Sequence, residues 1–242
     1  MVSLRQPRQF ATPFRHLHHA IGCASIPRVR APTLLLFIAM SGSFAWACAT
    51  TSTLDDAANL PPIAESDLRS PADFATIRDE AQRSSALFGE MNRVLSHARC
   101  ANCHPQDGVP RQGDQSRFHD PMVEGGEDNH GLTAMECTSC HQETNLALAR
   151  VPGAPGWHLA PVEMAWLGKT PAHICEQIKD PARNGKKTLA QIVEHLAHDK
   201  LVAWGWAPGH GRTPAPGTQA KLRALAAAWV DSGAHCPKEN AR

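Results

Sequence analysis

The sequence predicts a mainly α-helical domain with long irregular loops. Apolar residues recur at helical spacing in several segments, of which 87–95 and 222–229 are the clearest. The 242 residues also include 17 glycines and 19 prolines, which separate helices with turns and loops. No segment has the sustained alternation of polar and apolar residues that is typical of a β-strand.

The first predicted helices lie between residues 70 and 100. Ser70 followed by Pro71 starts a helix, because serine is a preferred N-cap and proline fits the first helical position. We expect a break near Ser84 and Ser85. The next helix leads into Cys100, and its apolar face consists of Leu87, Phe88, Met91, Val94 and Leu95.

The last third of the chain predicts three further helices, each opened by a threonine N-cap. They start at Thr170, Thr188 and Thr218. The second start is a capping box, since Gln191 follows Thr188 by three positions. The first two helices end near Asp180 and Asp199. We expect irregular structure at 105–131, 142–160 and 201–217.

Two short motifs carry the strongest functional signal. They read Cys100-Ala101-Asn102-Cys103-His104 and Cys137-Thr138-Ser139-Cys140-His141, and each is a C-x-x-C-H haem-attachment signature. Two thiols at this spacing can each form a thioether with one vinyl group of a haem, and the adjacent histidine binds the iron as proximal ligand. The sequence therefore predicts two covalently attached haem c groups. Their attachment residues are Cys100, Cys103, Cys137 and Cys140, and the proximal ligands are His104 and His141.

Paired cysteines also occur in two other kinds of site. Zinc knuckles are usually separated by about 15–20 residues, whereas residues 104–136 lie between Cys103 and Cys137. Thiol–disulfide exchange uses a single Cys-x-x-Cys near a βαβ pattern, and no such pattern is visible in this sequence. Neither kind of site requires the histidine that directly follows each pair.

The N-terminal segment has the composition of an export signal. Residues 1–30 contain five arginines and no acidic residue, an apolar run follows at 34–40, and small residues lead up to Cys48. We expect 1–47 to be an export signal that is removed; a permanent N-terminal anchor helix is the alternative. Residues 48–69 then form a flexible tether, and 70–242 form the dihaem domain.

The cysteine count adds two expectations. Of the eight cysteines, Cys23 lies in the expected signal and four lie in the motifs, which leaves Cys48, Cys175 and Cys236. Residues 45–48 resemble a bacterial lipobox, although Ala45 and Trp46 depart from its usual pattern. If Cys48 is lipidated, Cys175 and Cys236 form one disulfide and no thiol remains unpaired. If cleavage is ordinary, Cys48 is a free N-terminal thiol.

The charge of the chain argues against one class of partner. Without residues 1–47 the chain keeps 19 basic and 23 acidic residues, a net charge of −4 with histidine neutral. It has no basic stripe, so nucleic-acid binding has no support. The chain also contains no tyrosine and only 7 phenylalanines. Two buried porphyrins would supply apolar surface that this thin aromatic core lacks.

The sixth ligand of each iron is marked less clearly. Each half of the chain reads C-x-x-C-H, then an irregular loop, then a histidine, and this faint repeat nominates His119 and His158, one per haem. The reserve ligands are His195 and Met164. Each has an ordinary alternative: a loop residue for His119, a turn cap for His158, a solvent-facing position for His195 and core filling for Met164. The abundance of histidine favours His/His ligation.

Residues 100–237 resemble a group of bacterial dihaem cytochromes c. Besides the two motifs, the resemblance rests on four stretches: Trp157–Pro161, Met164–Trp166, Asp180–Gly185 and Trp204–Gly209. Genes of this group often accompany periplasmic or membrane-associated molybdenum hydroxylases, and some members are described as subunits of isoquinoline 1-oxidoreductase-like enzymes. The resemblance implies electron transfer from a dehydrogenase, and it does not assign axial ligands.

We therefore expect a periplasmic electron carrier, or an electron-transfer subunit of an oxidoreductase, rather than an enzyme in its own right. Its donor would be a dehydrogenase and its acceptor a cytochrome or oxidase, and a lipid anchor would keep it at a membrane. The alternative is a haem enzyme of peroxidase or reductase type with one open iron coordination site. A redox or gas sensor would need a signalling domain, and the sequence contains no sign of one.

Overall fold

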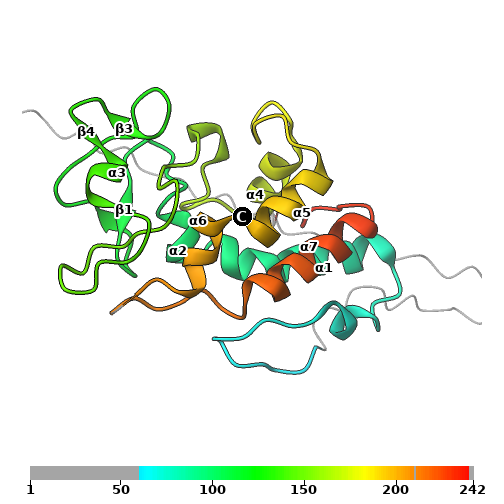
Figure 1. Cartoon of the computed structure of the whole chain (residues 1–242). Helices are drawn as coiled ribbons and strands as arrows, with labels where there is room; N and C mark the ends of the chain where they lie inside the picture. Colours follow the sequence, from blue (N-terminus) through cyan, green and yellow to red (C-terminus); the bar gives the residue numbers. More distant parts are fainter. Residues whose placement is uncertain (1–59, 210, 240–242) are drawn as a thin grey trace, which may run out of the picture. The chain divides into compact units, whose positions relative to one another are not determined.

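The computed structural model of the chain describes residues 60–209 and 211–239. Within these ranges the chain is mainly α-helical, as predicted, and its strands are confined to two short hairpins (Figure 1). The expected export segment 1–47 and Cys48 lie outside the described residues. No described helix is both long enough and apolar enough to cross a membrane.

Two long helices form the centre of the hydrophobic core. Helix α1 (Glu80–Leu95) packs along α7 (Gln219–Asp231), while α5 (Leu189–His198) covers α7 and α4 (Pro171–Lys179) covers α1 (Figure 1). Their inward positions repeat at helical spacing, so each helix buries one apolar stripe. The largest buried side chains of α1 and α7 include Phe88, Met91, Leu95, Leu222, Leu225 and Trp229.

Three helix starts follow the capping residues of the sequence. Thr170, Thr188 and Thr218 each accept a hydrogen bond from the backbone N–H three positions later. The Thr188 start also has the predicted capping box, since the Gln191 side-chain oxygen accepts a hydrogen bond from the Thr188 backbone N–H. These three helices are therefore confirmed with the starts predicted.

The first predicted helix is wrong in two respects. Ser70 and Pro71 open only a single 3₁₀ turn, η2 (Pro71–Phe74), and α1 then runs without a break across Ser84. The Ser84 hydroxyl donates to Trp229 O and accepts from His235 N, at 3.3 and 2.9 Å. These tertiary hydrogen bonds satisfy the hydroxyl inside the core, so the serine does not end the helix.

The last part of the predicted flexible tether belongs to the folded domain. Leu68 is only 2% exposed and packs in the core. Arg69 forms an ion pair with Glu90 of α1 at 3.1 Å, and Asp67 pairs with Lys221 of α7. The domain therefore begins before residue 70, where the sequence analysis placed its boundary.

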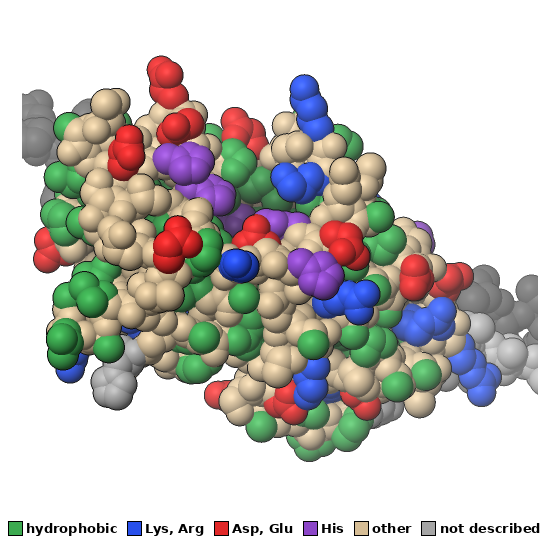
Figure 2. Space-filling model, in the orientation of Figure 1, with side chains coloured by type: hydrophobic (Ala, Val, Ile, Leu, Met, Phe, Trp, Pro, Cys, Tyr) green, Lys and Arg blue, Asp and Glu red, His purple; other side chains and the backbone are tan. Residues whose placement is uncertain are grey.

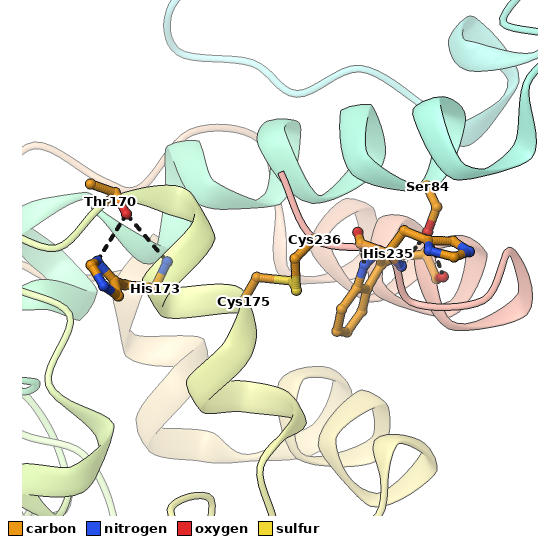
Figure 3. Close-up of a disulfide and its surroundings, with 7 residues drawn as sticks. Ser84, Thr170, His173, Cys175, His235 and Cys236 are labelled. Atoms are coloured by element: carbon orange, nitrogen blue, oxygen red, sulfur yellow. Dashed lines mark hydrogen bonds between the residues drawn. A yellow bond between two sulfur atoms is a disulfide. The ribbon is translucent and has the colours of Figure 1, made fainter. Parts of the chain in front are cut away.

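A disulfide joins α4 to the segment that follows α7. Figure 3 shows the bond between Cys175 and Cys236, whose Cα atoms are 5.6 Å apart. They are the two cysteines that were expected to pair if Cys48 is lipidated, and the disulfide between them is present. Near the same face, Thr170 caps α4 through the backbone N–H of His173, and its hydroxyl also meets the His173 ring.

Irregular chain from 105 to 160 carries the two hairpins. In the first, β1 (Arg111–Gln112) pairs antiparallel with β2 (Arg117–Phe118), with Arg111 opposite Phe118. In the second, β3 (Gly131–Leu132) pairs antiparallel with β4 (Met135–Glu136), with Gly131 opposite Glu136. Strands of two residues are too short to leave an alternating pattern, so the sequence analysis did not predict them.

The remaining elements are single turns. They are α2 (Ala98–Ala101), α3 (Cys137–Cys140), η3 (Val162–Met164), α6 (Lys200–Ala203) and η4 (Trp204–Trp206). The last two form the beginning of the segment 201–217, which was predicted to be irregular. Asp199 explains this turn, because its side chain accepts hydrogen bonds from Leu201 N and Val202 N.

Candidate functional site

The first cysteine motif lies where the core helices meet the irregular segment. Cys100 is in α2, and Cys103 and His104 follow the end of this helix. Both cysteines are free thiols and half-buried. Burial raises the pKa of Cys100 to about 12 and that of Cys103 to about 11. Disulfide-exchange motifs have thiols with lowered pKa values, so these thiols have the opposite character.

His104 is held by a hydrogen bond and by a ring. Its Nδ1–H donates to the carbonyl oxygen of Met164 at 2.7 Å, and its imidazole stacks on the indole of Trp166, with 3.4 Å between centroids and 5° between planes. A carbonyl can only accept, so the proton is on Nδ1 and Nε2 keeps its lone pair. Burial lowers the pKa of His104 to about 4, which keeps the ring neutral. Metal-binding histidines typically have this arrangement.

The second motif repeats this arrangement with different partners. Cys137 and Cys140 lie in α3, which directly follows the second hairpin. Nδ1–H of His141 donates to the carbonyl of Pro152 at 2.8 Å, and its ring stacks on Trp157 at 4.5 Å and 8°. Burial lowers the pKa of this histidine as well. Each motif histidine is therefore neutral and oriented by an indole, and among the described residues no hydrogen bond reaches its Nε2.

One cavity of about 520 Å³ brings the two motifs together, and it is in the size range of cofactor pockets. Its lining includes Cys103, Cys137, Cys140, His119, His141 and His158. Cys103 and Cys137 lie close enough for the charge of one thiolate to raise the pKa of the other. Figure 2 shows histidine side chains gathered along a hollow on one face of the molecule.

His119 lies beside His141, with 5.8 Å between ring centroids and 69° between the planes. Its Nδ1–H donates to Pro121 O at 2.8 Å, which again leaves Nε2 free. The sequence repeat would pair His119 with the first motif, whereas its ring contact in the structure is with the histidine of the second motif.

His158 lines the same cavity and stacks on His130 at 5.0 Å and 17°. Its Nδ1–H donates to Gly156 O at 2.5 Å. The charge of His158 contributes to the lowered pKa of His104. His158 is therefore near the first motif, although the repeat associated it with the second. The sequence analysis did not nominate His130.

The two reserve ligands have different surroundings. Nδ1 of His195 pairs with the carboxylate of Asp199 at 3.3 Å, and the charge of His195 also lowers the pKa of His104. His195 thus remains a candidate for the first motif. The Met164 side chain is buried in the hydrophobic core, and its carbonyl, rather than its sulfur, meets His104.

Asn145 ties the second site to the last third of the chain. Its Oδ1 accepts from Trp204 Nε1 at 2.9 Å and from Gly153 N at 3.0 Å, and its Nδ2 donates to Ala207 O at 2.9 Å. Trp204 in turn meets the edge of Trp157 at 4.9 Å. The indole that stacks on His141 is therefore supported by Trp204 and Asn145, of which the sequence analysis did not single out Asn145.

Arg99 is the most unusual charged residue of the site, and the sequence analysis missed it. Its side chain is 1% exposed and pairs with Asp114 at 2.5 Å. The guanidinium lies 5.8 Å from the centroid of the Trp204 ring and lines the cavity. Its Nε is buried and, within the described residues, has no hydrogen-bond partner.

Within the described residues, no group of three or more His, Cys, Asp or Glu side chains is arranged to hold a metal ion. The four motif thiols thus do not converge on a preformed zinc site. Comparison with protein-family models, with curated proteins and with solved structures finds no match to this chain.

Proposed function

We propose that this protein is an exported dihaem c-type cytochrome that carries electrons. Cys100 and Cys103 would attach one haem and Cys137 and Cys140 the other, with His104 and His141 as proximal ligands. When bound, each haem iron takes up and releases one electron. The protein holds the haem, orients the ligand and sets the electrostatic surroundings.

The proposal rests on one observation: both motif histidines are held by the same two kinds of contact. Both donate Nδ1–H to a carbonyl and stack on a tryptophan, so both present a neutral Nε2. A histidine that serves only to fill space needs no such pair of restraints. The donor set of two thiols and one neutral imidazole is present twice, and the cavity is lined by Cys103 of the first set and by all three residues of the second. This donor set fits two haems.

We propose His119 as the distal ligand of the second haem. Its ring is beside that of His141, and its Nδ1 is committed to a carbonyl. For the first haem we propose His158, which lines the cavity and whose charge acts on His104. His195 is the competing candidate, because its Nδ1 contacts the Asp199 carboxylate.

Export is part of the proposal. The composition of residues 1–47 supports a signal, and the Cys175–Cys236 disulfide suits an oxidising compartment such as the periplasm. We propose a dehydrogenase as donor, a cytochrome or oxidase as acceptor, and a lipid on Cys48 as membrane anchor.

Covalent haem is tested by producing the full chain in a bacterium that attaches haem c in its periplasm. We expect an intact mass with two haems added and with a processed N-terminus, lipidated at Cys48. The variants Cys100→Ala/Cys103→Ala and Cys137→Ala/Cys140→Ala should each keep one haem. A chain without covalent haem would contradict the proposal.

Low-temperature EPR of the oxidised protein separates the carrier from the haem enzyme. A carrier has two low-spin, six-coordinate irons, and we expect this result. A stable high-spin signal that responds to cyanide or peroxide would instead indicate an open coordination site and the enzyme alternative.

A further inference from the structure

Arg99 is almost fully buried, yet its guanidinium has only one hydrogen-bonding partner among the described residues. Moving a charged group out of water is costly unless it is paired and hydrogen-bonded. A guanidinium has five N–H donors, and the structure records one partner for them, the Asp114 carboxylate. Asp114 is shared, because it also accepts from the backbone N–H and the hydroxyl of Thr213. The buried Nε has no partner among the described residues.

A second arginine faces the same cavity. Arg212 is half-buried, and its guanidinium donates to the carbonyls of Pro208 and Arg150. Carbonyl partners leave its charge uncompensated. Arg99 and Arg212 are near enough for their charges to act on one another, and Arg212 also acts on His141. Two cations thus face one cavity that also holds the second motif histidine.

The cavity as a whole has an excess of positive charge. Among the described residues that line it, five are arginines and three are carboxylates, while the expected mature chain is acidic. One of the five, Arg111, already has its own partner in Asp107 at 2.7 Å. Arg99 also has a partner, Asp114, but that carboxylate is shared with Thr213, and among the described residues Arg212 has only carbonyl partners. Both cations can therefore bind a further anionic group in the cavity.

We propose that Arg99, assisted by Arg212, binds a propionate carboxylate of the haem attached at Cys137 and Cys140. The inference rests on the proposed function, because a haem must be present to supply the carboxylate. An arginine fork matches a carboxylate with two parallel hydrogen bonds, and the free Nε is one of the donors that such a pair uses.

The chemistry of haem decides which of the two groups Arg99 serves. The vinyl groups that bind cysteine and the propionates lie on opposite sides of the porphyrin. Arg99 directly precedes Cys100, and its charge acts on the thiols of Cys100 and Cys103. It is therefore at the vinyl side of the first haem. Through Trp204 and Trp157 it is connected instead to the ring of His141. Arg99, which directly precedes the first motif, would thus supply an anchor for the second haem.

The experiment compares the reduction potentials of the two haems in the intact holoprotein. The variants are Arg99→Gln, Arg99→Lys and Arg212→Gln, with Arg223→Gln, an exposed arginine of α7, as the matched control. Redox titrations followed by EPR resolve each low-spin haem. The single-haem cysteine variants assign the signals.

We expect Arg99→Gln to lower the potential of the second haem and to leave that of the first haem nearly unchanged. Loss of the cation, with the carboxylate left unpaired, favours the oxidised iron. Arg99→Lys keeps the charge but loses the fork, so its shift should be smaller and in the same direction. Arg212→Gln should also lower the second potential, and Arg223→Gln should change neither.

Each outcome decides a separate question. If the parent protein has no covalent haem, the proposed function fails. If it has two haems and both Arg99 variants keep both potentials, or shift only the first, the assignment of Arg99 is overturned while the proposed function stands. If Arg99→Gln does not fold, Arg99→Lys and Arg212→Gln decide: a lower second potential in both supports the assignment, and unchanged potentials overturn it.

Discussion

The imidazole of His104 lies parallel to the indole of Trp166, with 3.4 Å between ring centroids and 5° between planes. His141 and Trp157 repeat the relationship at 4.5 Å and 8°. A stacked indole restricts rotation of the imidazole about its Cβ–Cγ bond. Because Nδ1 also donates a hydrogen bond to a carbonyl oxygen, the direction in which Nε2 points is fixed at both sites by the protein alone.

Replacing Trp157 with leucine should loosen the ring of His141 without preventing haem attachment, because both cysteines of the motif remain. We expect two haems by mass spectrometry and a shifted, broadened EPR signal for the second haem. Trp206→Leu is the matched control, since Trp206 bonds to Pro216 O and does not line the cavity. An unchanged signal in Trp157→Leu would show that the stacking does not orient the ligand.

Removing a distal ligand should convert one haem from low spin to high spin. We expect this result for His119→Ala at the second haem and for His158→Ala at the first. His173→Ala is the control, because His173 is on the surface near Thr170 and Glu239. If His195→Ala, rather than His158→Ala, yields the high-spin first haem, the competing candidate is the ligand.

Gly217 should tolerate alanine poorly. Its φ is +67°, and a Cβ at this position would lie 2.7 Å from Cγ of Leu68. Gly168 also has a positive φ, +73°, but a Cβ there would meet nothing within 4 Å. Gly168→Ala should lower the free energy of unfolding by about 1–3 kcal/mol through backbone strain. Gly217→Ala should lower the free energy of unfolding by a further ~1–3 kcal/mol, because the added methyl group overpacks the core at Leu68.

Urea unfolding of both glycine variants measures this difference. If both variants lose the same unfolding free energy, Leu68 moves aside at little energetic cost. The segment before residue 70 would then not be firmly packed on the domain.

The double variant Cys175→Ser/Cys236→Ser should unfold more easily by about 2–5 kcal/mol, because the bond closes a long loop in the unfolded chain. The two cysteines are 61 residues apart. Urea unfolding under oxidising conditions measures the loss. Adding a reductant should lower the stability of the parent protein and leave the double variant unaffected; a parent protein indifferent to reductant would contradict the prediction.

Asp114 should make the domain less stable in acid. The hydrogen bond from the Thr213 hydroxyl, followed by the backbone bond and the charge of Arg99, lowers the pKa of Asp114 below its ordinary 3.8. A carboxyl whose pKa is lowered by folding stabilises the fold above its unfolded value, and this contribution disappears as the pH falls through the folded value. The contribution is thus complete at neutral pH and lost below about pH 4.

Asp114→Asn tests this dependence, since it keeps an acceptor oxygen but loses the charge. The difference in unfolding free energy between parent and variant should be constant above about pH 5 and shrink as the pH falls below about 4. A difference that stays constant throughout acid titration would show that the charge of Asp114 is immaterial.

Local chemistry explains why some elements could be predicted from the sequence. Helices α4, α5 and α7 start at threonine caps, and a cap acts within one turn. The break expected at Ser84 was wrong because its partners, Trp229 and His235, are far along the chain. Propensity alone does not register such tertiary hydrogen bonds.

The same distinction applies to the site. The C-x-x-C-H motifs are local, so their four cysteines and two histidines could be identified from spacing alone. Trp166, which stacks on His104, and Arg99, which faces the cavity, carry no such pattern, since their roles depend on distant partners. His119 was nominated from a repeat, but only the folded chain places it beside His141.

The contact between Asn145 and Trp204 also has a consequence for the order of events during maturation. The two residues are 59 positions apart, and a chain exported from its N-terminus delivers the second motif well before Trp204. If the chain is exported as proposed, His141 would enter the new compartment before the tryptophan that supports its own stacking partner. The second site is completed only after the last third of the chain has arrived. A truncated or stalled chain would carry both cysteine motifs and still lack a finished pocket.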